Sequence, residues 1–216
     1  MLIKLLKGWL NPLCLVLSIY AIAQGGWWLW VPFASLFVLF NLGDMLLPKD
    51  LSPPVDVAPD SLLFNLPIYV GLPLLVVLNA TFLWLLGSGD PAQMGLWLRT
   101  HLGVDLFAAR GTTSHGVQWV GGIISMAFLN VVTGTIAGHE LTHRTSRPFD
   151  MMIGRWMLTT TADTSFAIEH VYGHHARVCT PDDPATARRG ENYYAFAWRS
   201  TIYSYVHAYQ MEKARL

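Results

Sequence analysis

The chain has 216 residues, of which 53% are hydrophobic and only 13% are charged. Soluble domains carry about 25% charged residues, so this composition excludes an ordinary soluble domain and indicates a membrane protein. The net charge at pH 7 is zero and no basic patch is interleaved with aromatic residues, which argues against a nucleic-acid partner. Cys14 and Cys179 are too few and too far apart to suggest a disulfide framework or a cysteine zinc site.

Four apolar stretches predict transmembrane helices, because about 20 apolar residues cross a bilayer as a helix. We place these spans at residues 10–23, 27–47, 62–86 and 117–137. The first is short for a crossing, but it can form one arm of a helical hairpin whose turn is Gln24-Gly25-Gly26. The third carries Pro67 and Pro73, which favour a kink, and the fourth is rich in small residues that permit close helix packing.

The distribution of Lys and Arg favours four spans over three. With four spans, only Arg99 and Arg110 of the 14 basic residues lie in the loop on the opposite side of the membrane. Lys4, Lys7 and Lys49 then share one side with everything after residue 138. Omitting the first span would move Lys4 and Lys7 across the membrane, against the positive-inside tendency. We therefore predict that the region after residue 138 lies on the cytoplasmic face.

Five of the eight histidines fall in two groups, HELTH and then EHVYGHH. They are His139, His143, His170, His174 and His175. Neutral imidazole is the commonest metal ligand in proteins, and a spacing of four residues places two rings on one face of a helix. Each group contains such a pair, so the window predicts a polynuclear metal site.

The HELTH group also matches the HExxH pattern of zinc peptidases, in which the glutamate is the general base. A mononuclear zinc site needs three protein ligands and a water, which would leave at least two of the five histidines unexplained. We therefore expect Glu140 and Glu169 to accept hydrogen bonds from the rings and fix their tautomers, with a bridging role left open. His101, His115 and His207 are single, and we interpret them as loop or surface residues. Since imidazole binds iron, zinc and copper, the spacing does not identify the metal.

The region 139–216 is predicted to be a metal-binding region that follows a transmembrane region, 1–138. The apolar stretch 151–167 is not expected to cross the membrane, because only 26 residues separate the histidine groups and a round trip needs about 40. A helix that lies in the interface or dips partway into the membrane fits better. A turn is expected at 181–184 and the start of a further helix at 193–216. The predicted fold is therefore an all-α membrane protein with about four transmembrane helices, an interfacial helix and a cytoplasmic histidine-box region.

The sequence around the histidines resembles the integral-membrane alkane hydroxylases, or alkane 1-monooxygenases, of the membrane fatty acid desaturase and hydroxylase superfamily. The resemblance rests on GHELTHR at 138–144 and on EHVYGHHARVCTPDDPATARRGENYY at 169–194. It continues through Phe-Ala-Trp-Arg-Ser into a helix that ends Glu-Lys-Ala-Arg-Leu. It is specific over 115–216 and generic over 1–114.

This resemblance implies a di-iron, O2-dependent monooxygenase that hydroxylates the terminal methyl of alkanes or similar hydrocarbons. It implies two non-haem Fe ions, with His139, His143, His170, His174 and His175 among their ligands. It also implies electrons from rubredoxin and its NADH-dependent rubredoxin reductase, and a multi-pass position in the lipid bilayer of a bacterial inner membrane. A membrane desaturase or xylene-type hydroxylase is the near alternative. A membrane zinc metallopeptidase that uses HExxH at 139–143 is the alternative of a different class.

The chain departs from the family pattern at three places. Arg144 stands where lysine is frequent, and Cys179 stands where alanine is common. The larger departure is that the family carries further histidine boxes downstream, whereas this sequence ends at Leu216. We therefore expect an N-terminal fragment of a longer enzyme. A truncated product that binds metal weakly, or a membrane scaffold without activity, is the alternative.

Overall fold

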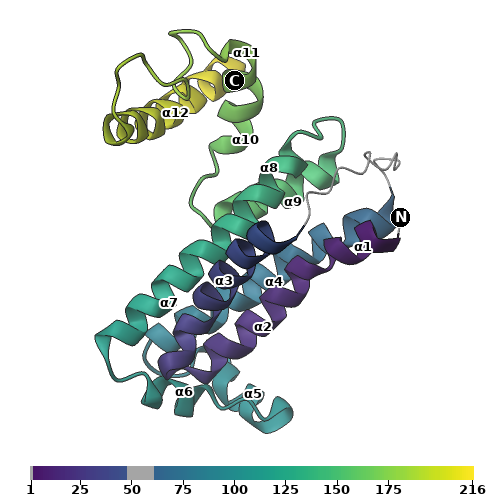
Figure 1. Ribbon diagram of the computed structural model, residues 1–216, viewed down its shortest axis with the longest axis vertical. Helices are drawn as coiled ribbons and strands as arrows, with labels where there is room; N and C mark the ends of the chain where they lie inside the picture. The colour runs from purple at the N-terminus through teal and green to yellow at the C-terminus, as the bar shows by residue number, and fades with distance from the viewer. Residues whose placement is uncertain (1, 48–60) are drawn as a thin grey trace. The chain divides into compact units, whose positions relative to one another are not determined.

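The computed structural model describes residues 2–47 and 61–216, and every regular element within these ranges is a helix (Figure 1). The predicted all-α class is therefore confirmed. The chain forms two compact units, Met1–Thr133 and Gly134–Leu216, and each is described here by itself. Lys49, one of the residues that orients the predicted topology, lies outside the described residues.

The first unit contains three of the predicted spans and most of the fourth. Its helices are α1 (Leu2–Gly8), α2 (Leu10–Gln24), η1 (Gly26–Trp30), α3 (Val31–Leu46), α4 (Leu62–Leu86), η2 (Pro91–Gln93), α5 (Met94–Leu102), α6 (Leu106–Thr112) and α7 (Gly116–Leu129). Four segments are long and apolar enough to cross a membrane: Leu5–Gln24, Gly26–Leu46, Leu62–Leu86 and Gly116–Thr142. They confirm the predicted number of spans. The first is longer than expected because the helical chain begins before residue 10, and its 20 residues suffice for a crossing.

The outer surfaces of these segments are apolar. Large side chains at least half exposed include Leu17 on α2, Phe40 on α3, Val76 and Leu83 on α4, and Ile123 on α7. A soluble monomer rarely exposes contiguous apolar patches of this extent, because water makes them costly, whereas lipid tails are as apolar as leucine. These surfaces, together with the four segments, make this an integral membrane protein.

The turn between the first two spans is the one predicted at Gln24–Gly26. Gly25 and Gly26 have positive φ angles of 66° and 56°, a conformation that favours glycine. A side chain at Gly25 would also collide with the carbonyl of Ala109 in α6. The N–H of Gly26 donates to Thr113 Oγ1 at 2.8 Å, so the turn is fixed against the segment that precedes α7.

Small residues let the spans approach closely. Gly121 of α7 lies against the indole of Trp30, and the neighbouring Gly122 lies against the ring of Phe82. A Cβ at either position would collide with the facing ring. This arrangement agrees with the expectation that small residues in the fourth span permit close packing.

Paired polar side chains join the spans where α7 passes into the π-helix η3 (Asn130–Thr135). Asn79 of α4 and Asn130 exchange two amide hydrogen bonds, of 2.9 Å and 3.2 Å. Thr133 donates to Asn11 Oδ1 of α2 at 2.8 Å. Because hydrocarbon offers no hydrogen-bond partner, these side chains satisfy one another and fix the helices in register.

The second unit contains both histidine groups. Its elements are α8 (Ile136–Thr142), α9 (Pro148–Thr159), α10 (Phe166–Ile168), η4 (Glu169–His174), α11 (His175–Arg177) and α12 (Tyr193–Arg215). α8 and α9 lie side by side, and Gly138 and Gly154 bring their backbones into contact (Figure 1). The helix expected over 151–167 is interrupted. α9 ends at Thr159, and a turn follows in which Ala162 has φ +57°. Hydroxyl groups of Thr160 and Thr161 bond back to the last carbonyls of α9, which ends the helix there.

The exposed apolar surface of α4 leads to a first prediction. Val76 lies near the middle of α4 with 56% of its surface exposed, so an arginine there would meet the hydrocarbon core. We expect Val76→Arg to raise the apparent free energy of membrane insertion of this segment by about 3 kcal/mol. Glycosylation mapping in microsomes measures this change, with Val76→Leu as the control that leaves insertion unaltered. Equal insertion of the two variants would show that this surface does not contact lipid.

Candidate metal centre

The first histidine group projects from the end of α8. His139 lies in the last turn of the helix and His143 is its C-cap. Their spacing of four residues brings the two rings together, with the Nε2 atoms 2.8 Å apart. The rings meet edge to face, with centroids 4.6 Å apart.

The second group projects from a π-helix instead of an α-helix. In η4 the hydrogen bonds join residues five apart, so His170 aligns with His175, and their Nε2 atoms lie 3.0 Å apart. His174, the partner expected from α-helical spacing, stacks beside His170 with ring centroids 5.4 Å apart. The π-helix therefore directs the adjacent residues His174 and His175 to different surroundings.

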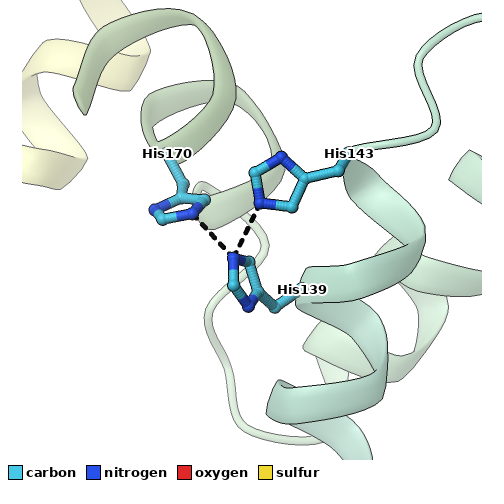
Figure 2. A group of neighbouring side chains, drawn as sticks. All are labelled: His139, His143 and His170. Carbon is cyan, nitrogen blue, oxygen red and sulfur yellow. Dashed lines mark hydrogen bonds between the residues drawn. The ribbon is translucent and has the colours of Figure 1, made fainter. Parts of the chain in front are cut away.

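The two groups meet through His139 and His170. Their Nε2 atoms are 2.8 Å apart, so His139 contacts both His143 and His170 (Figure 2). Ligand atoms of these three residues all lie within 4.8 Å of one another. Phe166 of α10 stacks on His170 at a centroid distance of 4.4 Å and meets the edge of His139, which restricts both rings.

The donor set fits a metal ion. An imidazole Nε2 carries either one lone pair or one N–H group. Nevertheless, His139 Nε2 lies within 2.8 Å of two other such atoms, and His170 Nε2 lies within 3.0 Å of two. Hydrogen bonds alone satisfy these contacts poorly, whereas a cation accepts a lone pair from every ring. Iron, zinc and copper all take imidazole ligands.

The protonation of the rings favours the same conclusion. Burial, and after it the charge that the neighbouring imidazoles would carry, lowers the pKa of His170 to about 4. Burial and the rings of His139 and His175 lower the pKa of His143, against a smaller opposing effect of Glu140. His170 and His143 are therefore neutral near pH 7, and neutral rings are the form that binds a metal.

His174 is held by a carboxylate that the sequence analysis did not identify. Its Nδ1 lies 2.9 Å from Oδ2 of Asp183, a buried residue in the loop after α11. Burial raises the pKa of Asp183, but hydrogen bonds from Thr186, the Ala185 N–H and His174 outweigh this and hold the pKa below its usual value. An ionised Asp183 accepts the Nδ1 proton of His174, which leaves the lone pair of His174 on Nε2.

The loop that carries Asp183 is anchored to α12 by Arg199. The guanidinium donates to both carboxylate oxygens of Glu191, at 2.6 Å and 2.7 Å. It also donates to the carbonyls of Pro184 and Thr186, at 3.0 Å and 3.1 Å. Hydrogen bonding to Arg199 lowers the pKa of Glu191 to about 2. This bidentate ion pair fixes the loop that presents Asp183.

The two glutamates expected to support the rings differ in their surroundings. Glu140 lies on the exposed side of α8, where its charge acts on His143. Glu169 is buried and accepts a hydrogen bond from Nδ1 of His207 on α12, at 2.9 Å. His207, interpreted from the sequence as a loop or surface residue, thus contacts the helix that carries the second histidine group.

The remaining histidines, His101 and His115, belong to the first unit of the chain. His101 in α5 stacks on Trp97, with ring centroids 5.0 Å apart. His115 is the N-cap of α7 and forms a capping box with Gln118. Both positions agree with the structural roles expected for single histidines.

The chain is similar to a desaturase family model and to several monooxygenases. Residues 114–216 match the family model described as fatty acid desaturase. Alkane 1-monooxygenase 1 of Pseudomonas aeruginosa is 29% identical over 85% of this chain and 44% of its own length. Alkane 1-monooxygenase of Acinetobacter baylyi is 40% identical over 43% of this chain and 22% of its own length. The xylene/toluene monooxygenase hydroxylase component of Pseudomonas putida is 28% identical over 98% of this chain and 50% of its own length.

The predicted resemblance to alkane 1-monooxygenases and to the desaturase and hydroxylase superfamily is therefore confirmed. The chain spans about half the length of the curated relatives that it matches along most of its own length.

Asp183 and its neighbour Asp182 provide a matched pair of substitutions. Asp183→Asn removes the ionised acceptor of the His174 Nδ1 proton, whereas Asp182 is exposed. Loss of such a partner typically weakens metal binding about 10- to 100-fold, and we expect Asp183→Asn to do so. Competition between the detergent-solubilised chain and a chelator for Co(II) measures the affinity. Asp182→Asn should bind as the unmodified chain does, and the same affinity in both variants would contradict the assigned role of Asp183.

The Glu191–Arg199 ion pair predicts a specific dependence of stability on pH. Because the pKa of Glu191 is lowered to about 2 in the folded protein, the ion pair stabilises the fold fully above pH 4.5. This contribution is lost as the pH falls from 4.5 towards 2. Glu191→Gln should lower the melting temperature at pH 7 and flatten its change across this acidic window. Glu212→Gln, which alters an exposed ion pair with Arg215, is the control and should leave the pH profile unchanged.

Proposed function

We propose that this chain supplies part of the metal centre of a di-iron, O2-dependent membrane monooxygenase that hydroxylates the terminal methyl of alkanes or similar hydrocarbons. The observation that carries the proposal is the convergence of imidazole nitrogens from HELTH and EHVYGHH. These groups lie in a chain with four membrane spans that resembles alkane 1-monooxygenases. Because the chain spans about half of those relatives, the activity is proposed for the whole enzyme.

Five side chains are the proposed iron ligands. His139, His143, His170 and His175 converge through Nε2, and His174 keeps its Nε2 lone pair because Nδ1 faces Asp183. When bound, two non-haem iron ions would supply the activation of O2 that an unreactive C–H bond requires, since no side-chain acid, base or nucleophile can attack such a bond. The chain's own residues hold the rings neutral, orient them and restrict their rotation.

The membrane setting is consistent with the proposed hydrocarbon substrate. A hydrocarbon has no polar group for a side chain to recognise, so its binding depends on the burial of apolar area, at about 25 cal/mol per Å2. The lipid around the exposed side chains of the four spans also concentrates hydrocarbons. We therefore infer that substrate reaches the enzyme through the membrane.

The proposed orientation places the histidine groups on the cytoplasmic face of a bacterial inner membrane. It rests on the positive-inside tendency, with only Arg99 and Arg110 on the opposite side among the 14 basic residues. A cytoplasmic position gives a soluble electron donor access to the metal. We propose that this donor is rubredoxin, reduced by its NADH-dependent reductase.

We also propose that α9 lies in the membrane interface, within a cytoplasmic-face region that begins at residue 139. Its exposed surface carries Phe149, Met152 and Trp156 next to Arg155. Apolar and aromatic side chains beside a basic residue are typical of a helix at the boundary of headgroups and acyl chains. Gly154 on its inner surface packs against α8, so this helix supports the first histidine group.

Two alternatives remain for the test. A xylene-type hydroxylase or a desaturase would use the same metal centre, and the match to the xylene/toluene monooxygenase component covers 98% of this chain. A zinc peptidase would use His139, His143 and Glu140, and the cluster of three histidines offers enough ligands for one zinc ion. The contact of His175 with His170 favours the larger centre.

The test measures metal content and turnover together. We expect the whole enzyme, purified from membranes of iron-supplied cells, to contain about two iron ions per chain and to convert alkanes to primary alcohols with rubredoxin, its reductase and NADH. His170→Ala should abolish iron binding and turnover because His170 joins the two groups. His101→Ala, at an exposed histidine of α5, is the matched control and should retain both. A single tightly bound zinc without iron would refute the proposal and favour the peptidase.

A further inference from the structure

The helix that carries the second histidine group is joined to α12 by a buried carboxylate, Glu169, and an imidazole, His207. Glu169, the first residue of η4, is 4% exposed, and its Oε1 lies 2.9 Å from Nδ1 of His207. His207 projects from α12, and its side chain is only 15% exposed. A buried carboxylate is costly unless it is hydrogen-bonded, so this contact ties η4 to α12.

Gly173 makes the approach of α12 possible. It lies four residues after Glu169 in η4, against the pair. A Cβ at residue 173 would lie 2.6 Å from Glu169 Oε1 and 3.2 Å from His207 Cε1. Any side chain at this position would therefore push the carboxylate and the imidazole apart.

The contact between Glu169 and His207 bears on the histidine rings because Glu169 belongs to the π-helix η4. π-Helices are rare and mostly single turns, and they are frequent at functional sites. In η4 this conformation aligns His170 with His175, while the adjacent Glu169 is directed to α12. A rotation of η4 about its axis would move the ring of His170 away from His139, which it approaches to 2.8 Å.

We propose that His207 is a positioning residue for the metal centre. Through its hydrogen bond to Glu169 it fixes the rotation of η4, and through η4 it fixes the directions of His170 and His175. The proposal rests on the proposed function, because it concerns the same metal centre. His207 itself binds no metal in this scheme, and it acts through the buried carboxylate.

The first test compares three variants of α12 in the detergent-solubilised chain loaded with Co(II). His207→Ala removes the donor, His207→Asn keeps an amide donor, and Gln210→Ala changes an exposed position one turn away. We expect His207→Ala to weaken Co(II) binding about 10- to 100-fold and to alter its visible ligand-field spectrum. His207→Asn should restore part of both, and Gln210→Ala should match the unmodified chain. An unaltered spectrum and affinity in His207→Ala would overturn the proposal.

A second measurement uses the metal-free chain, so that the positioning role is tested separately from metal binding. Hydrogen–deuterium exchange should rise over residues 169–175 in His207→Ala, and also in Gly173→Ala, where Glu169 and His207 are both present but pushed apart. Exchange in α8 should stay the same in both variants. Unchanged exchange over 169–175 would overturn the proposal. Absence of Co(II) binding in the unmodified chain would count against the proposed function, while the exchange result would still decide the role of His207.

Discussion

The second unit depends on the 2.8 Å approach of His139 Nε2 and His170 Nε2, which joins segments 31 residues apart in the sequence. Each of these nitrogen atoms can supply only one lone pair or one proton, so hydrogen bonds alone satisfy the contacts of His139 and His170 poorly. The lowered pKa of His170 has the same origin, since burial and neighbouring rings both disfavour an added proton. The apolar face of Phe166 restricts the same two rings. The unit is thus arranged to hold neutral imidazoles close together.

Support for the rings comes from α12 more than from the histidine-bearing helices themselves. Arg199 anchors the loop whose Asp183 faces His174, and His207 contacts Glu169, the first residue of η4. Arg199 and His207 both belong to α12, so one long helix supports the second histidine group at two places. The short helices α10 and α11 have three residues each, too few to be stable alone. Tertiary contacts therefore determine the geometry of the group.

Features that are local in the sequence could be predicted, and features that depend on distant contacts could not. The spans follow from the length of apolar runs, and the candidate metal site follows from the clustering of a scarce residue. The predicted helix 151–167 is longer than the observed α9, which ends at Thr159. Thr160 and Thr161 bond back to its last carbonyls and Ala162 has a positive φ, and the apolar pattern of the sequence contains neither feature. Spacing alone did not distinguish His174 from His175 as the partner of His170. The sequence predicts only a turn around Asp183. The contact of His207 with Glu169 joins residues 38 positions apart, so no local pattern predicts it.

The π-helix at 169–174 has a consequence for changes in chain length. A π-turn amounts to one extra residue accommodated within an α-helix, so removing one residue here would restore α-helical geometry without breaking the chain. The deletion would leave the composition of the histidine group nearly intact and still move its rings to other directions. In the present geometry the ring of His175 contacts His170, whereas the ring of the adjacent His174 contacts Asp183. Insertions and deletions should therefore be tolerated in the exposed loop around residues 187–190 but not within η4, whose length determines where the rings of His170, His174 and His175 lie.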